Sequence, residues 1–210
     1  MFSTTKSPFN TTNGRISPEQ LGSSLVEASL NFADAILGGL KKEQSGTSHK
    51  GLLSDLVEQP QVVTLLLISF ETAKIFCHIQ KRVCNDKAIL DRVWQGLVSG
   101  LHSVQVDGQQ LLPKGYELLN TMTQRYHQIL QVEWGRKLDP VVVRFYPSDA
   151  IQKLCEDIKA FHFRNDPSLK NNEYLNLDEM MFVAAISATY FASADYFTSE
   201  LKLTYNSQSP

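Results

Sequence analysis

Few side chains in this sequence have the type and spacing that chemistry needs, and His78 is the most suggestive of them. At 100° per residue, His78 shares a narrow polar stripe with Glu71 and Lys74 on a segment that is otherwise apolar. Such a stripe faces solvent or a partner subunit, or it forms a buried polar cluster that binds a ligand or moves a proton. The sequence favours the first interpretation and leaves the second open.

A second histidine lies among aromatic residues, which is typical of a ligand pocket. His127 follows Tyr126 directly and precedes Trp134 by two helical turns. A helical bundle that carries a haem, a tetrapyrrole or a lipid could use these residues with Phe76 and His78. The candidate cofactor-binding residues are therefore His78, His127 and Trp134, although our first expectation is that the protein needs no cofactor.

The sequence contains no motif for metal binding or nucleophilic catalysis. Its three cysteines and five histidines include no Cys-x-x-Cys and no His-x-x-x-His spacing, which excludes the common zinc patterns. It also has no Gly-x-Ser-x-Gly and no glycine-rich phosphate loop. We predict no metal site and no catalytic residue. An enzyme without a short signature stays an alternative, and Glu71 with His78 is the only acid and imidazole pair that it could use.

The segment from Pro60 to Val83 is the element that would hold the polar stripe in place. Proline suits the first helical position, where the missing N–H has no partner to lose. A helix that is apolar nearly all round is a buried one. The apolar residues that cover most of its circumference are Val62, Leu65, Leu66, Ile68, Phe70, Ala73, Ile75, Phe76, Cys77, Ile79 and Val83.

Apolar residues at spacings of three and four predict further helices around this central one. We expect an all-α, single-domain bundle of six to seven helices, formed by residues 17–203. Residues 1–16 are polar and predicted to be disordered, and residues 204–210 are predicted to be a flexible tail. The expected helices are 17–40, a short one near 52–57, 60–83, 86–101, 113–138, 148–163 and 176–203, with an extended connector at 139–147.

Two rows of small residues predict close helix contacts. Gly96 and Gly100 lie four residues apart, and Ala184, Ala188 and Ala192 continue the same spacing on the last helix. Small side chains let two helix backbones approach one another closely. We interpret both rows as candidate interaction surfaces for a protein partner or a second copy of the chain.

The overall composition is that of a soluble protein. Apolar residues make up 42% and charged residues 20% of the chain, and the formal net charge is −2. This balance argues against nucleic-acid binding, which needs clustered Lys and Arg. The apolar runs 62–70 and 180–194 are shorter than the roughly 20 residues of a membrane span. We predict no transmembrane segment and a cytoplasmic location, where three cysteines would stay free thiols.

Two short segments resemble phycobiliproteins, a family of the globin-like class. The first is Cys84-Asn85-Asp86 before an amphipathic helix. The second is Pro147-Ser148 with Ile158-Lys159-Ala160 and His162, before a last helix rich in Tyr and Ala. The resemblance implies a globin-like arrangement of the helices. Chromophore binding is not carried over to Cys84, because Asn85 stands where the family has arginine.

The sequence as a whole favours a non-catalytic helical interaction or regulatory protein that acts as a homo-oligomer or adaptor. The alternatives are a bundle that carries a haem, tetrapyrrole or lipid, and an enzyme without a short signature. The partner, the ligand and the biological process are not encoded in any motif.

Overall fold

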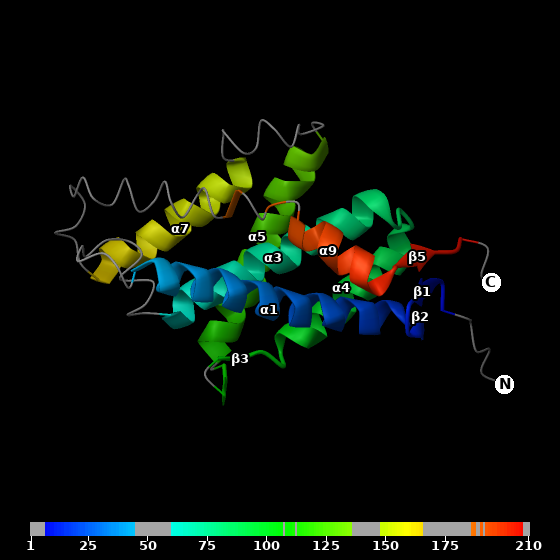
Figure 1. The fold of residues 1–210 in the computed structure, drawn as a ribbon, viewed down its shortest axis with the longest axis horizontal. Helices are drawn as coiled ribbons and strands as arrows, with labels where there is room; N and C mark the ends of the chain where they lie inside the picture. Colours follow the sequence, from blue (N-terminus) through cyan, green and yellow to red (C-terminus); the bar gives the residue numbers. More distant parts are fainter. Residues whose placement is uncertain are drawn as a thin grey trace.

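The computed structural model describes residues 7–44, 60–106, 108–111, 113–135, 148–165, 186–187, 190 and 192–207. Within these residues the fold is an all-α bundle with two very small sheets, which confirms the predicted fold class (Figure 1). The globin-like arrangement stays a prediction. The helices are α1 (Pro18–Gln44), α3 (Pro60–Arg82), α4 (Lys87–Leu101), α5 (Pro113–Gly135), α7 (Asp149–Asn165) and α9 (Ala192–Leu201).

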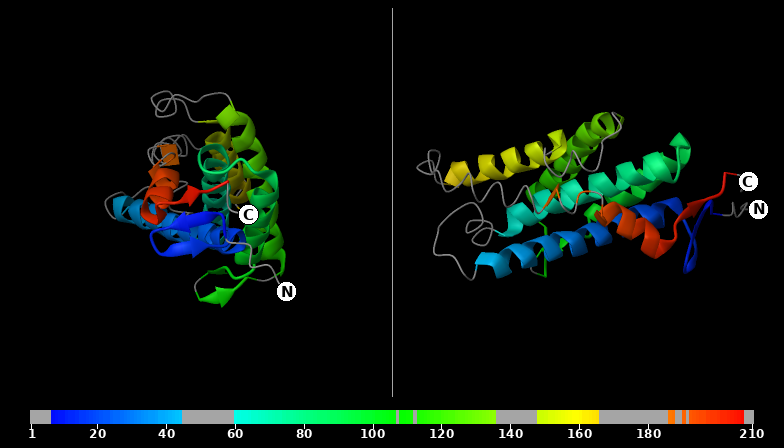
Figure 2. Two further views of the ribbon diagram at one scale, coloured as in Figure 1. Left: turned by 90° about the vertical axis from the view of Figure 1, so that its right-hand side faces the viewer. Right: turned by 45° about the horizontal axis from the view of Figure 1, so that its top comes forward.

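Helix α3 is the centre of the bundle, as its apolar circumference predicted. It contacts α1, α5, α7 and α9, and the right-hand view of Figure 2 shows it between α1 and α7. By length and composition, Gln61–Arg82 is the one helix of the described residues that could span a membrane. However, 94% of its most apolar window is buried inside the structure, as in the core helix of a soluble protein.

Side-chain caps fix where three of the helices begin, at residues 17, 86 and 148, where the sequence predicted these helices to start. Ser17 and Gln20 form a reciprocal capping box, with the Gln20 backbone N–H donating to Ser17 Oγ over 3.1 Å and the Ser17 N–H to Gln20 Oε1 over 3.0 Å. Asp86 accepts from the Ile89 N–H at the start of α4. Ser148 accepts from the Ile151 N–H at the start of α7.

Helices α1 and α4 cross at glycines on both sides. A Cβ atom on Gly22 would lie 2.0 Å from the carbonyl oxygen of Val93, and one on Gly96 would lie 2.0 Å from the carbonyl oxygen of Glu19. Gly100 also faces α1, next to Ser23. The close approach predicted for Gly96 and Gly100 is therefore present, but the neighbouring helix belongs to the same chain. These glycines supply no argument for a homo-oligomer.

Residues 7–16 and 204–207 take part in a small sheet, whereas the disorder predicted for residues 1–16 and the flexible tail predicted for 204–210 stay predictions. Strands β1 (Phe9–Thr11), β2 (Gly14–Ile16) and β5 (Thr204–Tyr205) form one antiparallel sheet in the order β2-β1-β5, at the end of the bundle where both termini lie (Figure 1). The Phe9 side chain is fully buried, and its ring centroid lies 5.5 Å from that of Tyr205. This ring contact joins the polar N-terminal segment to the last strand.

The remaining differences concern the ends of helices. Helix α1 continues through Gly38 to Gln44, beyond the end that the sequence predicted at residue 40. Helix α9 begins at Ala192, which is exposed, and residues 186–187 are helical before it. The predicted helix at 52–57, the connector at 139–147, Ala184 and Ala188 lie outside the described residues. A second small sheet pairs β3 (Gln105–Val106) with β4 (Gln109–Gln110).

Candidate binding cleft between three helices

An open cleft of about 680 Å³ lies where α3, α4 and α5 meet, and we call it the α3–α4–α5 cleft. Helix α3 supplies residues from its last two turns, α4 from its first two turns and α5 from its C-terminal half, and Asn85 lies between α3 and α4. The lining residues are Phe76, Gln80, Lys81, Asn85, Lys87, Leu90, Asp91, Trp94, His127 and Gln131.

Three aromatic rings form the apolar part of the cleft. The ring centroids of Phe76, Trp94 and His127 lie 5.0 to 5.1 Å from one another, so all three are in mutual contact. Trp94 and His127 are inclined by only 36°, whereas Phe76 meets both edge-on, at 68° and 67°. Edge-on and tilted contacts at this distance are favourable for aromatic pairs. The contacts among the three rings therefore hold these side chains in place.

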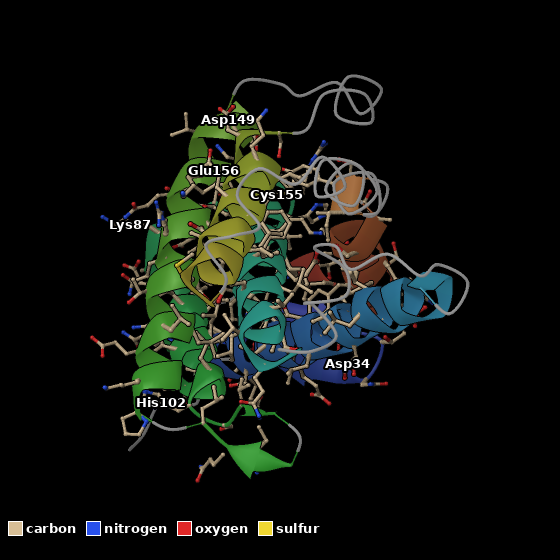
Figure 3. The ribbon with its side chains drawn as sticks, turned by 90° about the vertical axis from the view of Figure 1, so that its left-hand side faces the viewer. Asp34, Lys87, His102, Asp149, Cys155 and Glu156 are labelled. Carbon is tan, nitrogen blue, oxygen red and sulfur yellow. The ribbon has the colours of Figure 1, made fainter. Side chains whose placement is uncertain are left out.

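Two amides lie next to the histidine. Gln131 Nε2 donates to Gln80 Oε1 over 3.1 Å, and His127 Nε2 lies 3.4 Å from the same oxygen. The Gln80 carbonyl oxygen therefore lies within hydrogen-bond distance of both the second amide and the imidazole. The charged residues of the lining, Lys81, Lys87 and Asp91, are exposed at the outer edge. Figure 3 shows Lys87 at the periphery of the molecule, on the side of α5.

Burial sets the protonation state of His127. Loss of hydration lowers the pKa of its imidazole to about 4. No carboxylate is among the causes of that shift, and the partner of Nε2 is a neutral amide. At neutral pH the imidazole is therefore uncharged, and it presents one ring nitrogen and an aromatic face.

The cleft is assembled from the same short pattern on three helices. Each helix contributes two lining residues that are four apart and therefore lie on one face of that helix. The pairs are Phe76 and Gln80, Leu90 and Trp94, and His127 and Gln131. Sequence reasoning named His127 and Phe76 but missed Trp94 and the two glutamines. The repeated aromatic-to-glutamine spacing on α3 and α5 is the signal that could have found the two glutamines.

A second polar feature is the ion pair of the α3 stripe, and it is completely buried. Lys74 Nζ lies 2.7 Å from both carboxylate oxygens of Glu71, and neither side chain is exposed. Ser193 of α9 donates to Glu71 Oε2 over 2.8 Å. Burial lowers the pKa of the Lys74 ammonium, while Glu71 works in the opposite direction. The stripe is thus a buried polar cluster, and the preference for solvent or a partner was wrong for Glu71 and Lys74.

Aromatic side chains enclose this ion pair and connect it to α5. The Lys74 ammonium lies 5.5 Å from the ring centroid of Phe70 and 5.7 Å from that of Tyr190. The Tyr190 hydroxyl donates to Glu133 Oε2 over 2.9 Å and accepts from Trp134 Nε1 over 2.8 Å. Burial raises the pKa of the Glu133 carboxyl. These bonds join α3, α5 and the chain before α9.

His78 lies at the edge of this network and not in the cleft. Its Nε2 lies 3.6 Å from the Asp195 carboxylate of α9, and its ring centroid lies 5.9 Å from that of Trp134. Burial lowers the pKa of His78 more than the nearby Asp195 raises it. Glu71 and His78, the acid and imidazole pair proposed for an enzyme, thus have different partners in the structure.

The structure therefore separates the three candidate cofactor residues. His127 lines the α3–α4–α5 cleft, whereas His78 and Trp134 belong to the buried network beside α9. Tyr126, the other proposed pocket residue, is fully buried and donates to Asp157 over 3.1 Å. Within the part of the chain that the structure describes, no one pocket brings all of these residues together. Within the described residues no group of three His, Cys, Asp or Glu could hold a metal ion.

Comparisons of the chain with protein-family models, curated proteins and solved structures found no match. The functional argument therefore rests on the residues and their geometry.

Proposed function

We propose that this protein is a non-catalytic helical binding protein and that its ligand occupies the α3–α4–α5 cleft. The observation that carries the proposal is the trio of contacting rings, Phe76, Trp94 and His127, at one side of an open 680 Å³ cleft with a polar outer edge. Ligand sites in proteins are concave and mostly apolar, with a few polar groups that set the orientation.

The protonation state of the cleft supports binding over acid–base catalysis. A general base works best when its pKa lies near the working pH. The pKa of His127 is about 4, because the ring is buried. Gln80, its partner, is an amide that cannot take up a proton at neutral pH. A weakly basic imidazole next to an amide suits the orientation of a bound ligand better than the transfer of a proton.

Fluorine NMR tests the proposal, because the chain contains two tryptophans and only Trp94 lines the cleft. The protein is labelled with fluorotryptophan and titrated with naphthoate, naphthamide and naphthylmethylammonium. We expect at least one of these planar probes to move the Trp94 resonance saturably. The Trp134 resonance reports on the buried network and is expected to stay in place.

Two substitutions on α5 show whether the effect belongs to the cleft. Gln131→Tyr places a ring in the cleft and should abolish the shift of the Trp94 resonance. Gln128→Tyr puts the same side chain on an exposed position of α5 outside this cleft and should preserve the shift. A Trp94 resonance that none of the probes moves, or one that moves equally in Gln131→Tyr, contradicts the proposed function.

A tetrapyrrole stays an alternative ligand for the same cleft. A neutral imidazole, the state that burial gives His127, is also the state that binds haem iron. The absorbance spectrum of freshly purified protein decides this alternative. A visible band that disappears in Gln131→Tyr supports it, and a colourless protein removes it.

A further inference from the structure

We infer that the ligand of the α3–α4–α5 cleft is a planar aromatic anion of carboxylate type. This inference rests on the proposed function and names the chemical class that the cleft selects. It follows from three separate features of the lining: the shape of the ring trio, the balance of charge and the orientation of the amide pair.

The rings select a planar molecule. Trp94 and His127 are inclined by only 36° with centroids 5.0 Å apart, so the two rings pack obliquely against one another, and both side chains stay partly exposed at the cleft. Phe76 packs edge-on against both and holds them from the side. Offset stacking on such a surface is favourable for a flat aromatic ring and adds to the gain from burying its area. A flexible alkyl chain has no comparable stacking contact.

The charges select an anion. Lys81 and Lys87 line the cleft, and neither ammonium group forms an ion pair with any other residue that the structure describes. Asp91 is the single carboxylate of the lining. His127 is neutral at pH 7, because burial lowers its pKa to about 4. Two ammonium groups against one carboxylate leave a single net positive charge, which one carboxylate on a ligand would balance.

The amide pair supplies a donor next to the rings. Gln80 Oε1 is already occupied by Gln131 Nε2. Within the part of the chain that the structure describes, the Gln80 Nε2 group has no hydrogen-bond partner, so it is available to a carboxylate oxygen. This N–H donor would stabilise an anionic group more than a neutral one, because hydrogen bonds to charged acceptors are the stronger ones.

Isothermal titration calorimetry with the three naphthalene probes tests the inference. They share one ring system and differ in charge, so naphthamide separates stacking from electrostatics. We expect naphthoate to bind about two- to fivefold more tightly than naphthamide, and naphthylmethylammonium to bind most weakly, as for exposed charge pairs worth up to about 1 kcal/mol. The preference should weaken as salt is added, because the lysines are exposed.

Charge variants locate the effect at the cleft. Lys81→Gln and Lys87→Gln should each lower the affinity for naphthoate about two- to fivefold and leave the affinity for naphthamide unchanged. Asp91→Asn should raise the affinity for naphthoate by a similar factor. Lys114→Gln is the matched control, because Lys114 is exposed at the start of α5 and outside the lining, so it should change neither affinity.

The outcomes separate this inference from the proposed function. If all three probes bind in the cleft with equal affinity, or the cationic probe binds best, the anion class is wrong and the binding role stands. If Lys114→Gln weakens naphthoate as much as Lys81→Gln does, the selectivity is a property of the whole surface and the inference fails. If no probe reaches the cleft, both proposals fail together.

Discussion

At the scale of single residues, the structure gives opposite roles to polar groups that look alike in the sequence. Glu71 and Lys74 are fully buried and bonded to each other, whereas Lys81, two turns further along the same helix, is exposed at the cleft. Removing two charges from water is expensive, and their attraction repays this only with good geometry and further hydrogen bonds. Ser193 supplies such a bond to Glu71.

The first prediction concerns this buried pair. Lys74→Met should lower the free energy of unfolding by about 3–5 kcal/mol, because it leaves the Glu71 carboxylate buried without a counter-ion. Glu71→Leu combined with Lys74→Met should recover most of that loss, because no charge is then buried. Urea denaturation followed by circular dichroism measures both.

The control is an ion pair with the same spacing on the surface. Lys153 lies 2.9 Å from Glu156 at positions three apart on α7, and Glu156 is 66% exposed. Glu156→Gln removes this exposed pair and leaves the contact of Lys153 with Asp157 at 3.1 Å, so it should change stability by no more than about 1 kcal/mol. Figure 3 shows Glu156 on the outer part of α7, in contrast to the buried Cys155 next to it. Equal losses for the two variants would mean that Glu71 and Lys74 are not buried in solution.

The second prediction concerns the pH dependence of His127. Its pKa is about 4 in the folded protein, below the ordinary value of 6.5. The unfolded chain therefore binds more protons between pH 6.5 and 4. The contribution of His127 to stability should be complete above pH 6.5 and should decrease as the pH falls towards 4.

Two measurements check this dependence. NMR titration of the folded protein should show the His127 imidazole still neutral at pH 5.5. Denaturation at pH 7 and pH 5 should show a smaller loss of stability in His127→Phe than in the original protein. A His127 resonance that titrates near 6.5 would show that the ring is hydrated, and the argument for a neutral aromatic face would be lost.

At the scale of elements, the sequence predicted where the helices lie better than which helices pack against one another. Periodicity and caps placed the start of α1, α4 and α7 correctly, because Ser17, Asp86 and Ser148 act through bonds within one helical turn. The partner of Gly96 could not be predicted, because glycine spacing shows that a backbone can approach but not which one. It is α1 of the same chain.

The third prediction tests the crossing of α1 and α4. Gly96→Ala should lower the free energy of unfolding by about 1–3 kcal/mol, because the new methyl group would meet the Glu19 carbonyl at 2.0 Å and the helices must move apart. Gly38→Ala is the matched control. No atom lies within 4 Å of a Cβ on Gly38, so better helix propensity should stabilise the protein by up to about 1 kcal/mol.

Thermal denaturation measures both variants. We expect a lower melting temperature for Gly96→Ala and a slightly higher one for Gly38→Ala than for the original protein. If both substitutions stabilise the protein, α1 and α4 do not cross at Gly96 in solution. In that case the row of Gly96 and Gly100 would again be a candidate contact for a partner.

At the scale of the whole molecule, strand β1 near the N-terminus pairs with strand β5 near the C-terminus, and the sequence did not predict this pairing. Residues 7–16 contain few apolar side chains, so composition indicated disorder. Pairing of β1 with β5 across nearly the whole chain buries Phe9 against Tyr205. Pairing between distant segments leaves no periodic signal in either one. For the same reason the cleft was only partly predicted, because Phe76, Trp94 and His127 meet through three different helices.

The fourth prediction tests the order of the N-terminal segment. Phe9→Ala should lower the free energy of unfolding by about 3–5 kcal/mol, because the ring is fully buried. Arg15→Ala, at an exposed position of β2, should leave stability within about 0.5 kcal/mol of the original. If Phe9→Ala is as neutral as Arg15→Ala, the segment is disordered as the composition suggested.

Self-association and a cytoplasmic location stay predictions for the assembled molecule. Val132 of α5 is 59% exposed beside a groove that α5 and α7 form, and Asp149 and Glu156 of that groove are labelled in Figure 3. Sedimentation equilibrium over a wide range of concentrations measures the oligomeric state. A mass equal to one chain at every concentration would remove the homo-oligomer.

The central claim is that the three contacting rings of the α3–α4–α5 cleft receive a planar anion. The most direct measurement is the set of intermolecular nuclear Overhauser effects between bound naphthoate and the aromatic protons of the protein. We predict cross-peaks from the naphthalene protons to Trp94 and His127 and none to Trp134. Saturable binding with cross-peaks to Trp134, or with none to Trp94 and His127, would contradict the account.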